Sequence, residues 1–430
     1  MKICMITTFF GAHSFGGDAA YVDRLGQALC RRGHEVHVYY CVDAFNAVRG
    51  GHPLRPYTPP PGLVLHPMKS RFGILSPVAT QATGLPLFKS SELLEALDDP
   101  ATDVVHFHNI SLVGGPGVLG LGANRRAVRI MTAHEHWLHC PMHLLWKYDR
   151  EPCDAPTCVS CCLQGGRPPQ VWRSTSAIER GLRQLDALIF PSRHALEEHA
   201  RRGFGAFVPL VHQPYFLPDG WSGGIERQPP ERLERPYLAA AGRLVKMKGF
   251  QRLIPLLRYL PEVDLRIAGT GPHEPVLRAM ARDLPNVRFE GLLDGRALAR
   301  LFRSARAVVV PSLFPETFGY VVLEAFAMGT PVVVHEGGGA LYETGFLSGG
   351  GLGYRTDTEL LTALRRMVHD HGLHRDLAER GFAMRMGEWS ETDHLGRYFA
   401  LIGQARAARD QKPFPRPHSL GRRRPISTSH

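Results

Sequence analysis

Short apolar runs alternate along this chain with segments whose apolar positions recur at helical spacing. The chain opens with an apolar run over residues 3–10, then a helical pattern, then the strand-like run EVHVYY. The alternation returns in the second half, where Ala-Val-Val-Val at residues 307–310 precedes an apolar helical stretch at residues 320–328. Strands that alternate with helices are typical of βαβ units, which build parallel sheets. The pattern therefore predicts an α/β protein with doubly wound sheets.

The length and composition of the chain favour two domains. A chain of 430 residues with 44% hydrophobic content can bury two cores. A charged, Pro- and Gly-rich stretch, LPDGWSGGIERQPPERLERP, is typical of a linker between them. We expect the two domains to face each other across a cleft, because ligands of such sheets bind beyond the carboxyl ends of the strands. The expected segments are a first domain at residues 1–214, a linker at 215–235, a second domain at 236–387, a last helix at 388–410 and a tail at 411–430.

The net charge of +11 is partly a property of the tail. The tail carries Lys412, Arg416 and the run Arg422, Arg423, Arg424, and no acidic residue. Its Pro-rich composition without apolar periodicity predicts disorder. The arginine run has the chemistry to contact anionic lipid or nucleic acid, but a solvated tail is the simpler interpretation, and we expect no nucleic-acid partner.

The sequence patterns at the N-terminus and in the apolar segments bear on location. The opening apolar run is short and lacks the positive flank and cleavage site of a secretory signal. No window approaches the roughly eighteen uninterrupted apolar residues of a membrane span. We therefore expect a cytoplasmic protein.

Two glutamates flank the start of the predicted helix at residues 320–328. In PSLFPETFGYVVLEAFAMGTPVVV, Glu316 lies in the loop before this helix and Glu324 lies about one turn inside it. The N–H groups and the dipole at a helix N-terminus suit a bound phosphate. Carboxylates accept hydrogen bonds, which suits sugar hydroxyls. The alternative is a strand–helix–strand unit with ordinary capping glutamates.

Basic and glycine-rich segments precede this pair. The segment AAAGRLVKMKGF places Arg243 and Lys248 beyond the end of a small-residue strand, where they can converge on an anion. An arginine fork and a mobile lysine charge together suit a diphosphate. The next strand runs into Gly269-Thr270-Gly271, a turn that permits close approach to a ligand. Two solvated basic residues are the alternative.

The order of these motifs resembles a known family. GRLVKMKG, IAGTG, VRFEGLL, PSLFPETFG and LEAFAMGTPVV are similar to the C-terminal domain of family 4 of the retaining, nucleotide-sugar-dependent glycosyltransferases. The opening segment, MKICMITTFFGAHSFGGDAAYVDRLGQALCRRGHEVHVYYC, agrees with the first domain of that family. The resemblance implies two Rossmann-like domains in the GT-B arrangement, the first on the acceptor side and the second binding the nucleotide sugar. It also implies that the helix at residues 388–410 crosses back to the first domain.

The resemblance implies a retaining, hexosyltransferase-type reaction from a nucleoside-diphosphate sugar to a glycan, lipid-linked or small-molecule acceptor. Arg243, Lys248 and the amides near Gly17 would stabilise the departing diphosphate. No Asp-x-Asp is placed to hold a catalytic metal, so no cofactor is expected for catalysis. Peripheral contact with the inner face of a membrane stays open, since relatives use lipid-linked acceptors. The implied site has His134 and Glu316 as catalytic residues and Gly16, Gly17, Arg243, Lys248, Gly271, Thr317, Phe318, Gly319 and Glu324 as donor-binding residues.

Histidines mark the ends of two strands in the first half. His134 matches a family histidine that contacts the donor sugar, although Glu135 follows it where the family more often has Asp. In DVVHFHN, we assign His106 and His108 to opposite faces of the strand, so that one of them packs in the core. We expect His108 on the acceptor side, with a purely structural role as the alternative.

Other reactions and roles are compatible with similar ligands. Nucleotide-sugar epimerases and sugar phosphorylases use a related two-domain fold, and a non-catalytic nucleotide-sugar-binding protein is a third alternative. Transfer to a second molecule, rather than isomerisation or phosphorolysis, would distinguish the transferase.

The eight cysteines divide into two groups. Cys4, Cys30 and Cys41 lie in strand and helix patterns and are expected to be small core residues. The other five occur together at residues 140–165, an insertion that is not part of the minimal family pattern. Clustered thiols in a reducing compartment more often bind metal than form disulfides. We expect a structural zinc site, with an iron–sulfur cluster or free thiols as alternatives. The expected ligands are Cys140, Cys153, Cys158 and Cys161, with Cys162 as a substitute for Cys161.

Overall fold

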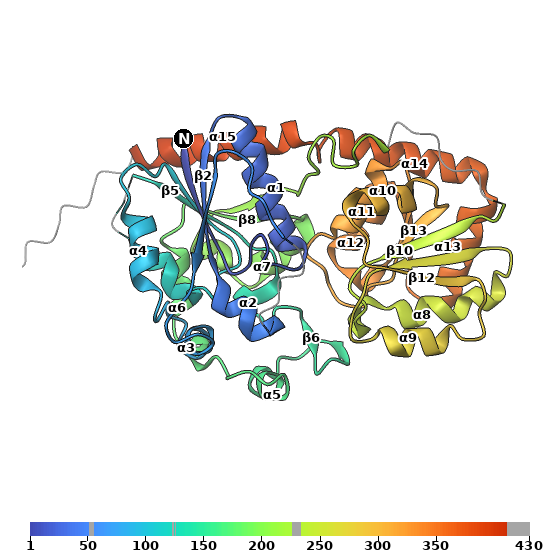
Figure 1. Ribbon diagram of the computed structural model, residues 1–430, viewed down its shortest axis with the longest axis horizontal. Helices are drawn as coiled ribbons and strands as arrows, with labels where there is room; N and C mark the ends of the chain where they lie inside the picture. Colours follow the sequence, from blue (N-terminus) through green and yellow to red (C-terminus); the bar gives the residue numbers. More distant parts are fainter. Residues whose placement is uncertain (51–55, 123, 125, 226–233, 411–430) are drawn as a thin grey trace, which may run out of the picture.

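Two α/β units lie side by side, each built around one parallel sheet (Figure 1). The computed structural model describes residues 1–50, 56–122, 124, 126–225 and 234–410. The predicted basic tail at 411–430 and part of the predicted linker, residues 226–233, lie outside the described residues. Two parallel sheets confirm the predicted fold class.

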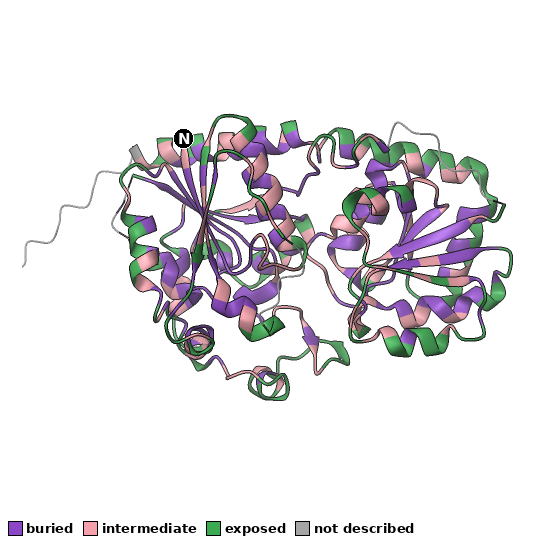
Figure 2. Ribbon diagram, viewed as in Figure 1, coloured by how far each residue is buried: buried purple, intermediate pink, exposed green. Residues whose placement is uncertain are grey.

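The first sheet has seven parallel strands in the order β3-β2-β1-β4-β5-β8-β9. Its central strands are buried along almost their whole length, because helices cover both faces, and they are therefore continuous apolar runs (Figure 2). The strands are β1 (Lys2–Thr7), β2 (Glu35–Cys41), β3 (Leu63–Met68), β4 (Val104–Phe107), β5 (Val128–Thr132), β8 (Ala187–Phe190) and β9 (Leu210–His212).

The first strand is shorter than the apolar run that predicts it. It ends at Thr7, and Phe10 instead forms an isolated bridge with His13, which turns the chain toward the first helix. The helices of this unit are α1 (Gly17–Arg31), α2 (Val42–Arg49), α3 (Leu75–Thr83), α4 (Ser90–Asp98), α6 (Ala177–Leu182) and α7 (Arg193–Arg201).

The second sheet has six parallel strands in the order β12-β11-β10-β13-β14-β15. Its strands are β10 (Tyr237–Ala241), β11 (Asp264–Ala268), β12 (Val287–Gly291), β13 (Ala307–Val310), β14 (Val332–His335) and β15 (Gly351–Tyr354). Its helices are α8 (Phe250–Leu253), α9 (Glu274–Met280), α10 (Gly295–Arg303), α11 (Tyr320–Ala327), α12 (Ala340–Tyr342), α13 (Asp357–His369) and α14 (His371–Met386).

The last helix, α15 (Glu391–Asp410), leaves the second unit and runs along the first (Figure 1). Two arginines fix it there: Arg406 donates to Asp103 at 2.9 Å and Arg409 to Asp186 at 2.7 Å. Tyr398 is fully buried against the first unit. The helix therefore ties the end of the described chain to the first sheet.

The cysteine-rich segment leaves the first unit between β5 and β8 (Figure 1). It folds into an antiparallel pair, β6 (Trp146–Lys147) and β7 (Glu151–Pro152), followed by the short helix α5 (Cys158–Gln164). Over the described residues, the helices are too short or too polar to cross a bilayer.

Candidate active site between the two units

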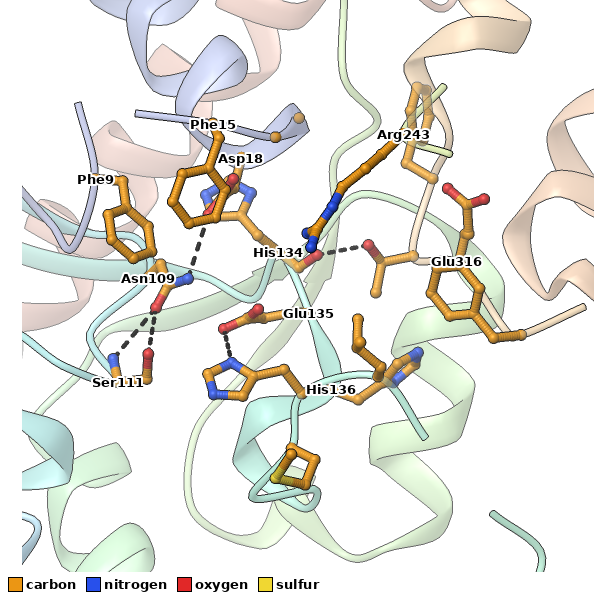
Figure 3. A pocket seen from close by; sticks show the side chains of 18 of the residues that line it. Phe9, Phe15, Asp18, Asn109, Ser111, His134, Glu135, His136, Arg243 and Glu316 are labelled. Carbon is orange, nitrogen blue, oxygen red and sulfur yellow. Dashed lines mark hydrogen bonds and ion pairs between the residues drawn. The ribbon is translucent and has the colours of Figure 1, made fainter. Parts of the chain in front are cut away.

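A cavity of about 420 Å³ opens between the carboxyl ends of the first-sheet strands and the loop after β13 (Figure 3). This is the position that doubly wound sheets use for ligands. The predicted site residues that line it are Gly16, Gly17, His134, Arg243, Glu316, Thr317, Phe318 and Gly319. Lys248 lies just behind Glu316, whereas His108, Gly271 and Glu324 are set back from the lining.

The N-terminus of α1 faces this cavity. Gly16 precedes the helix with φ of 93°, a conformation that favours glycine. A Cβ on Gly17 would meet the Tyr320 ring at 3.5 Å, so the first turn of α1 lies directly against the second unit. The free N–H groups of this turn and the helix dipole favour an anion here.

Asp18, in the first turn of α1, is a polar group of the site that the sequence pattern did not single out. It accepts a hydrogen bond from the Asn109 side chain at 3.2 Å, and Asn109 in turn accepts one from the Ser111 hydroxyl at 2.8 Å (Figure 3). Burial raises the pKa of Asp18 to about 6, and nearby Glu135 adds to the rise. The position of Asp18 directly after Gly16 and Gly17 is the sequence feature from which its place at the site could have been predicted.

Arg243 enters the cavity from the second unit without a compensating charge. Among the described residues, its guanidinium has neither an ion-pair nor a hydrogen-bond partner, and it lies open to the cavity. Partial burial, with repulsion from Arg49, lowers the pKa of Arg243. An unpaired arginine fork in a cleft is suited to a bidentate anionic ligand.

Glu316 is held by a network of contacts within the second unit. Lys248 donates to its carboxylate at 2.7 Å, and the Ser312 hydroxyl donates to the same oxygen. The Glu316 backbone N–H donates to Gly338 at 3.0 Å, and its carbonyl accepts from Ala340 at 2.9 Å. The predicted convergence of Arg243 and Lys248 on one anion stays a prediction; Lys248 already pairs with Glu316 and keeps further N–H donors.

The loop that carries Glu316 is also bonded to the first unit on both sides of this residue. His136 donates through Nε2 to the Pro315 carbonyl at 3.0 Å, and the Thr317 hydroxyl donates to the His134 carbonyl at 2.6 Å. The structure therefore positions Glu316 against the end of β5.

His134 lines the cavity, and both nitrogens of its ring have partners. Its Nε2 pairs with Nδ1 of His108 at 3.0 Å, and its Nδ1 is bonded to the Tyr215 hydroxyl. Burial lowers the pKa of His134 to about 3, so the ring is neutral. Because both ring nitrogens are engaged, the predicted direct contact between this imidazole and a donor sugar requires one of these bonds to open.

The assignment of His106 and His108 to opposite faces is wrong. Residues two apart in a strand face the same side, and the two rings lie 3.9 Å apart. Both are fully buried, and burial lowers the pKa of each. His108 supports His134 from behind through the bond between their rings, and its predicted place on the acceptor side stays a prediction.

Glu324 points away from the cavity. Its carboxylate accepts from Arg24 of α1 at 3.0 Å, and the Arg24 guanidinium lies 4.2 Å from the centre of the Tyr320 ring. This ion pair joins the two units. The predicted contact of Glu324 with the nucleotide-sugar donor stays a prediction, since a carboxylate in an ion pair still has lone pairs to offer.

Gly271 contributes packing to the site. A Cβ at this position would lie 2.3 Å from the Leu244 carbonyl oxygen, so only glycine lets the two loops approach. The Leu244 loop carries Arg243, and Gly271 therefore acts on the cavity through the placement of that arginine.

A carboxylate–imidazole pair lies on the first-unit side of the cavity. Nδ1 of His143 and the Glu135 carboxylate are 2.5 Å apart, and both residues line the cavity. Nε2 of His143 is buried and has no hydrogen-bond partner among the residues that the structure describes. Glu135 has a sequence signal only as the residue after His134, and His143 has none, because its place depends on the inserted segment.

The cysteines of the insertion are free thiols in this structure. Within the described ranges, their sulfur atoms do not form a group of ligand atoms all within 4.8 Å of one another. Burial raises the pKa of Cys153 and Cys158, and neighbouring thiols add to the rise. The four-thiolate zinc site stays a prediction. Cys4 and Cys41 are buried as expected, and Cys30 is half-buried.

Two family models match the chain, one for each unit. The model described as Glycosyltransferase Family 4 matches residues 15–209, and the one described as Glycosyl transferases group 1 matches residues 224–384. Together they span most of both sheets.

Curated relatives are glycosyltransferases with different named substrates. The chain is 34% identical over 39% of its length to the lipopolysaccharide core biosynthesis glycosyltransferase LpsE of Rhizobium meliloti, covering 50% of that protein. It is 26% identical over 94% of its length to a GDP-mannose-dependent alpha-mannosyltransferase of Mycobacterium tuberculosis, covering 98% of that protein. For the first four relatives, the chain spans only 27–50% of their length.

Solved structures share the whole two-unit fold. Sucrose-phosphate synthase from Thermosynechococcus elongatus superposes with a TM-score of 0.69 at 20% identity, covering 95% of this chain and 99% of that one. Anabaena HepE in complex with UDP gives 0.63 at 15% identity, covering 94% and 100%. At these identities the likeness establishes the GT-B fold and leaves the ligands to be argued from the residues.

Proposed function

Because the chain belongs to family 4 of the GT-B glycosyltransferases, we propose that it is a retaining glycosyltransferase. It moves a sugar from a nucleoside-diphosphate sugar to an acceptor hydroxyl. One observation carries the proposal: unpaired Arg243 and the N-terminus of α1 face the same cavity as Glu316. Two anion-binding features beside a fixed carboxylate suit a diphosphate joined to a sugar.

The donor would lie with its diphosphate between Arg243 and the first turn of α1. Departure of the diphosphate concentrates negative charge there, and fixed donors that face the developing charge lower the barrier. Glu316 would accept hydrogen bonds from sugar hydroxyls, with Lys248 and Ser312 holding its carboxylate in place. The acceptor oxygen attacks the anomeric carbon, and its proton passes to the departing phosphate oxygen, so that no enzyme base is required.

The acceptor would approach from the first unit. Four polar side chains on this side of the cavity offer hydrogen-bond donors and hydrogen-bond acceptors: Asp18, Asn109, Glu135 and His143. A polar wall of this kind suits hydroxyl groups of a second sugar or a polar head group. We assign these residues to acceptor binding.

We also propose peripheral contact with an anionic membrane, as for a lipid-linked acceptor. Large apolar side chains on and around α3 are exposed, and rings of Phe72 and Phe88 lie 4.3 Å apart. Lys69 and Arg71 adjoin them, and basic residues beside an exposed apolar surface favour anionic lipid. The exposed apolar residues of this α3 surface are Phe72, Ile74, Leu75, Val78, Leu85 and Phe88.

Vesicle flotation tests the membrane proposal. We expect Ile74→Ser/Leu75→Ser to weaken flotation with anionic vesicles and to leave the solution reaction unchanged. Leu292→Ser is the control, because Leu292 is also an exposed apolar residue, 73% exposed in the second unit compared with 56% for Ile74 and 60% for Leu75. The membrane contact would be contradicted if Leu292→Ser lost as much flotation as Ile74→Ser/Leu75→Ser. It would also be contradicted if the parent floated equally well with neutral and anionic vesicles.

A donor screen tests the transferase proposal itself. The protein is incubated with UDP- and GDP-hexoses and candidate acceptors, and nucleoside-diphosphate release and the anomeric configuration of the product are measured. We expect release that depends on acceptor and a product with retained configuration. An isomerised nucleotide sugar without release would identify an epimerase, and phosphate-dependent cleavage would identify a phosphorylase.

A further inference from the structure

Three histidines of the first unit form a cluster beside the active site. His136 and His139 lie in the turn after β5, and His199 lies on α7. One ring nitrogen from each can be chosen so that all three atoms lie within 4.8 Å of one another. His136 and His199 are buried, and His139 is partly buried.

Hydrogen bonds to backbone carbonyls fix two of the three tautomers. Nε2 of His136 lies 3.0 Å from the Pro315 carbonyl, and Nδ1 of His199 lies 2.7 Å from the Ala195 carbonyl. A carbonyl oxygen only accepts, so both of these nitrogens carry a proton. Nδ1 of His136 and Nε2 of His199 are therefore lone-pair donors when the rings are neutral.

The remaining nitrogens of the cluster are unsatisfied. Nδ1 of His136, Nε2 of His199 and both nitrogens of His139 are buried without a hydrogen-bond partner in the described structure. Burial lowers the pKa of His136 and His199 to about 4 and that of His139 to about 2, so protonation does not supply the missing partners at neutral pH. Buried polar atoms without a partner call for an ion or a water, and the three rings can each offer one nitrogen within 4.8 Å of the others.

We propose that His136, His139 and His199 bind one zinc ion, which fixes the contact between His136 and the Glu316 loop. Neutral imidazole nitrogens are preferred zinc ligands, and three of them leave a fourth position for water. The carbonyls of Pro315 and Ala195 are the outer partners that such histidines need for orientation. Bonds of about 2.0–2.1 Å would draw the three rings together by small side-chain rotations.

The charges around the cluster are compatible with a cation. Arg202, just past the end of α7, acts electrostatically on all three histidines, and it is paired with Glu198 of that helix. Arg173 donates to the carbonyls of Trp137 and Leu138, which lie between His136 and His139 in the chain. His139 is adjacent to Cys140 in sequence and lines one cavity with Cys158 and Cys162, so the histidine ligands and the predicted thiolate ligands are neighbours that the experiments must distinguish.

Zinc titration of the metal-free, full-length protein tests the proposal. We expect His139→Gln to weaken zinc binding by more than about 100-fold, since even outer partners of a metal ligand contribute 10- to 100-fold. The matched control is His374→Gln, which alters a half-buried histidine of the second unit whose Nε2 is also unpaired. It should bind zinc as the parent does. Equal zinc affinity in His139→Gln and the parent would overturn the proposal.

Cobalt distinguishes the histidine site from the cysteines. Cobalt(II) at three imidazoles gives visible d–d bands without the near-ultraviolet thiolate charge-transfer band. We expect these bands to persist in Cys158→Ser and to disappear in His139→Gln. A charge-transfer band lost in Cys158→Ser, with all bands retained in His139→Gln, would assign the metal to the cysteines and overturn the proposal.

Thermal unfolding covers the case in which His139→Gln does not fold. His139→Leu removes two unpaired nitrogens, so the metal-free variant should melt no lower than the metal-free parent. Zinc should raise the Tm of the parent and leave that of His139→Leu unchanged. A zinc-dependent rise in the Tm of His139→Leu equal to that of the parent would overturn the proposal.

Discussion

The ion pair between Arg24 and Glu324 predicts how strongly the two units are coupled. Its atoms lie 3.0 Å apart, and the side chains are 15% and 13% exposed. At this distance and an effective dielectric constant of about 20, the attraction is about 5 kcal/mol, before the cost of desolvation is subtracted. Removing one partner of such a buried pair leaves an uncompensated charge, which typically costs about 3–5 kcal/mol.

Arg24→Met tests this estimate, because it keeps apolar volume and leaves Glu324 buried without its partner. We expect the Tm to fall by about 6–20 °C, using about 2–4 °C per kcal/mol for a unit of this size. The double variant Arg24→Met/Glu324→Met should recover much of the loss, since the unpaired charge is then gone.

The control for Arg24→Met is an ion pair of the second unit that is exposed. Arg252 pairs with Asp357 at 2.7 Å, with side chains 34% and 50% exposed. Arg252→Met should lower the stability by less than about 1 kcal/mol. A fall in Tm for Arg24→Met no larger than that for Arg252→Met, or purely additive loss in the double variant, would refute the reasoning.

Two further predictions concern the cavity. Arg243→Ala and Lys248→Ala should each raise the KM for the nucleotide sugar. We expect a rise of about 10- to 100-fold for Arg243→Ala, because a charged hydrogen-bond donor is lost. An unchanged KM for the nucleotide sugar in both variants would contradict the proposed diphosphate site. Burial raises the folded-state pKa of Asp18 to about 6. The folded state therefore binds the carboxyl proton more tightly than the unfolded state does. The stability that this proton provides is lost as pH rises through about 6. Asp18→Asn should therefore raise the Tm at pH 8 relative to the parent and lose this advantage near pH 4; an equal effect at both values would show that the carboxyl is not perturbed.

Local sequence patterns were sufficient to predict the strands and helices whose ends and loops form the cavity. The run Ala-Val-Val-Val forms the buried strand β13, and the apolar stretch after Gly319 forms α11. A β-branched run between turn residues and an apolar helical pattern each determine one element from nearby residues alone. The positions of Gly16, Arg243 and Glu316 at one cavity followed, because parallel strands present their carboxyl ends at one edge.

The side-chain partners could not be predicted in the same way. Glu324 is 300 residues from Arg24, and Lys248 is occupied by Glu316 through contacts that depend on the packing of two loops. His136, His139 and His199 meet only because α7 packs beside the turn after β5. Such contacts arise from tertiary packing, for which spacing along the chain contains no signal. The assignment of His106 and His108, by contrast, was an error in applying the strand period.

The turnover of Glu316→Gln tests the central claim most directly. The substitution keeps the shape of the side chain and removes the charge that Lys248 holds in the cavity. With a donor and acceptor identified by the screen, we expect kcat to fall by about 100-fold or more, as when a fixed polar group of an active site is removed, at a Tm close to that of the parent. Turnover near that of the parent would contradict the placement of glycosyl transfer at Glu316.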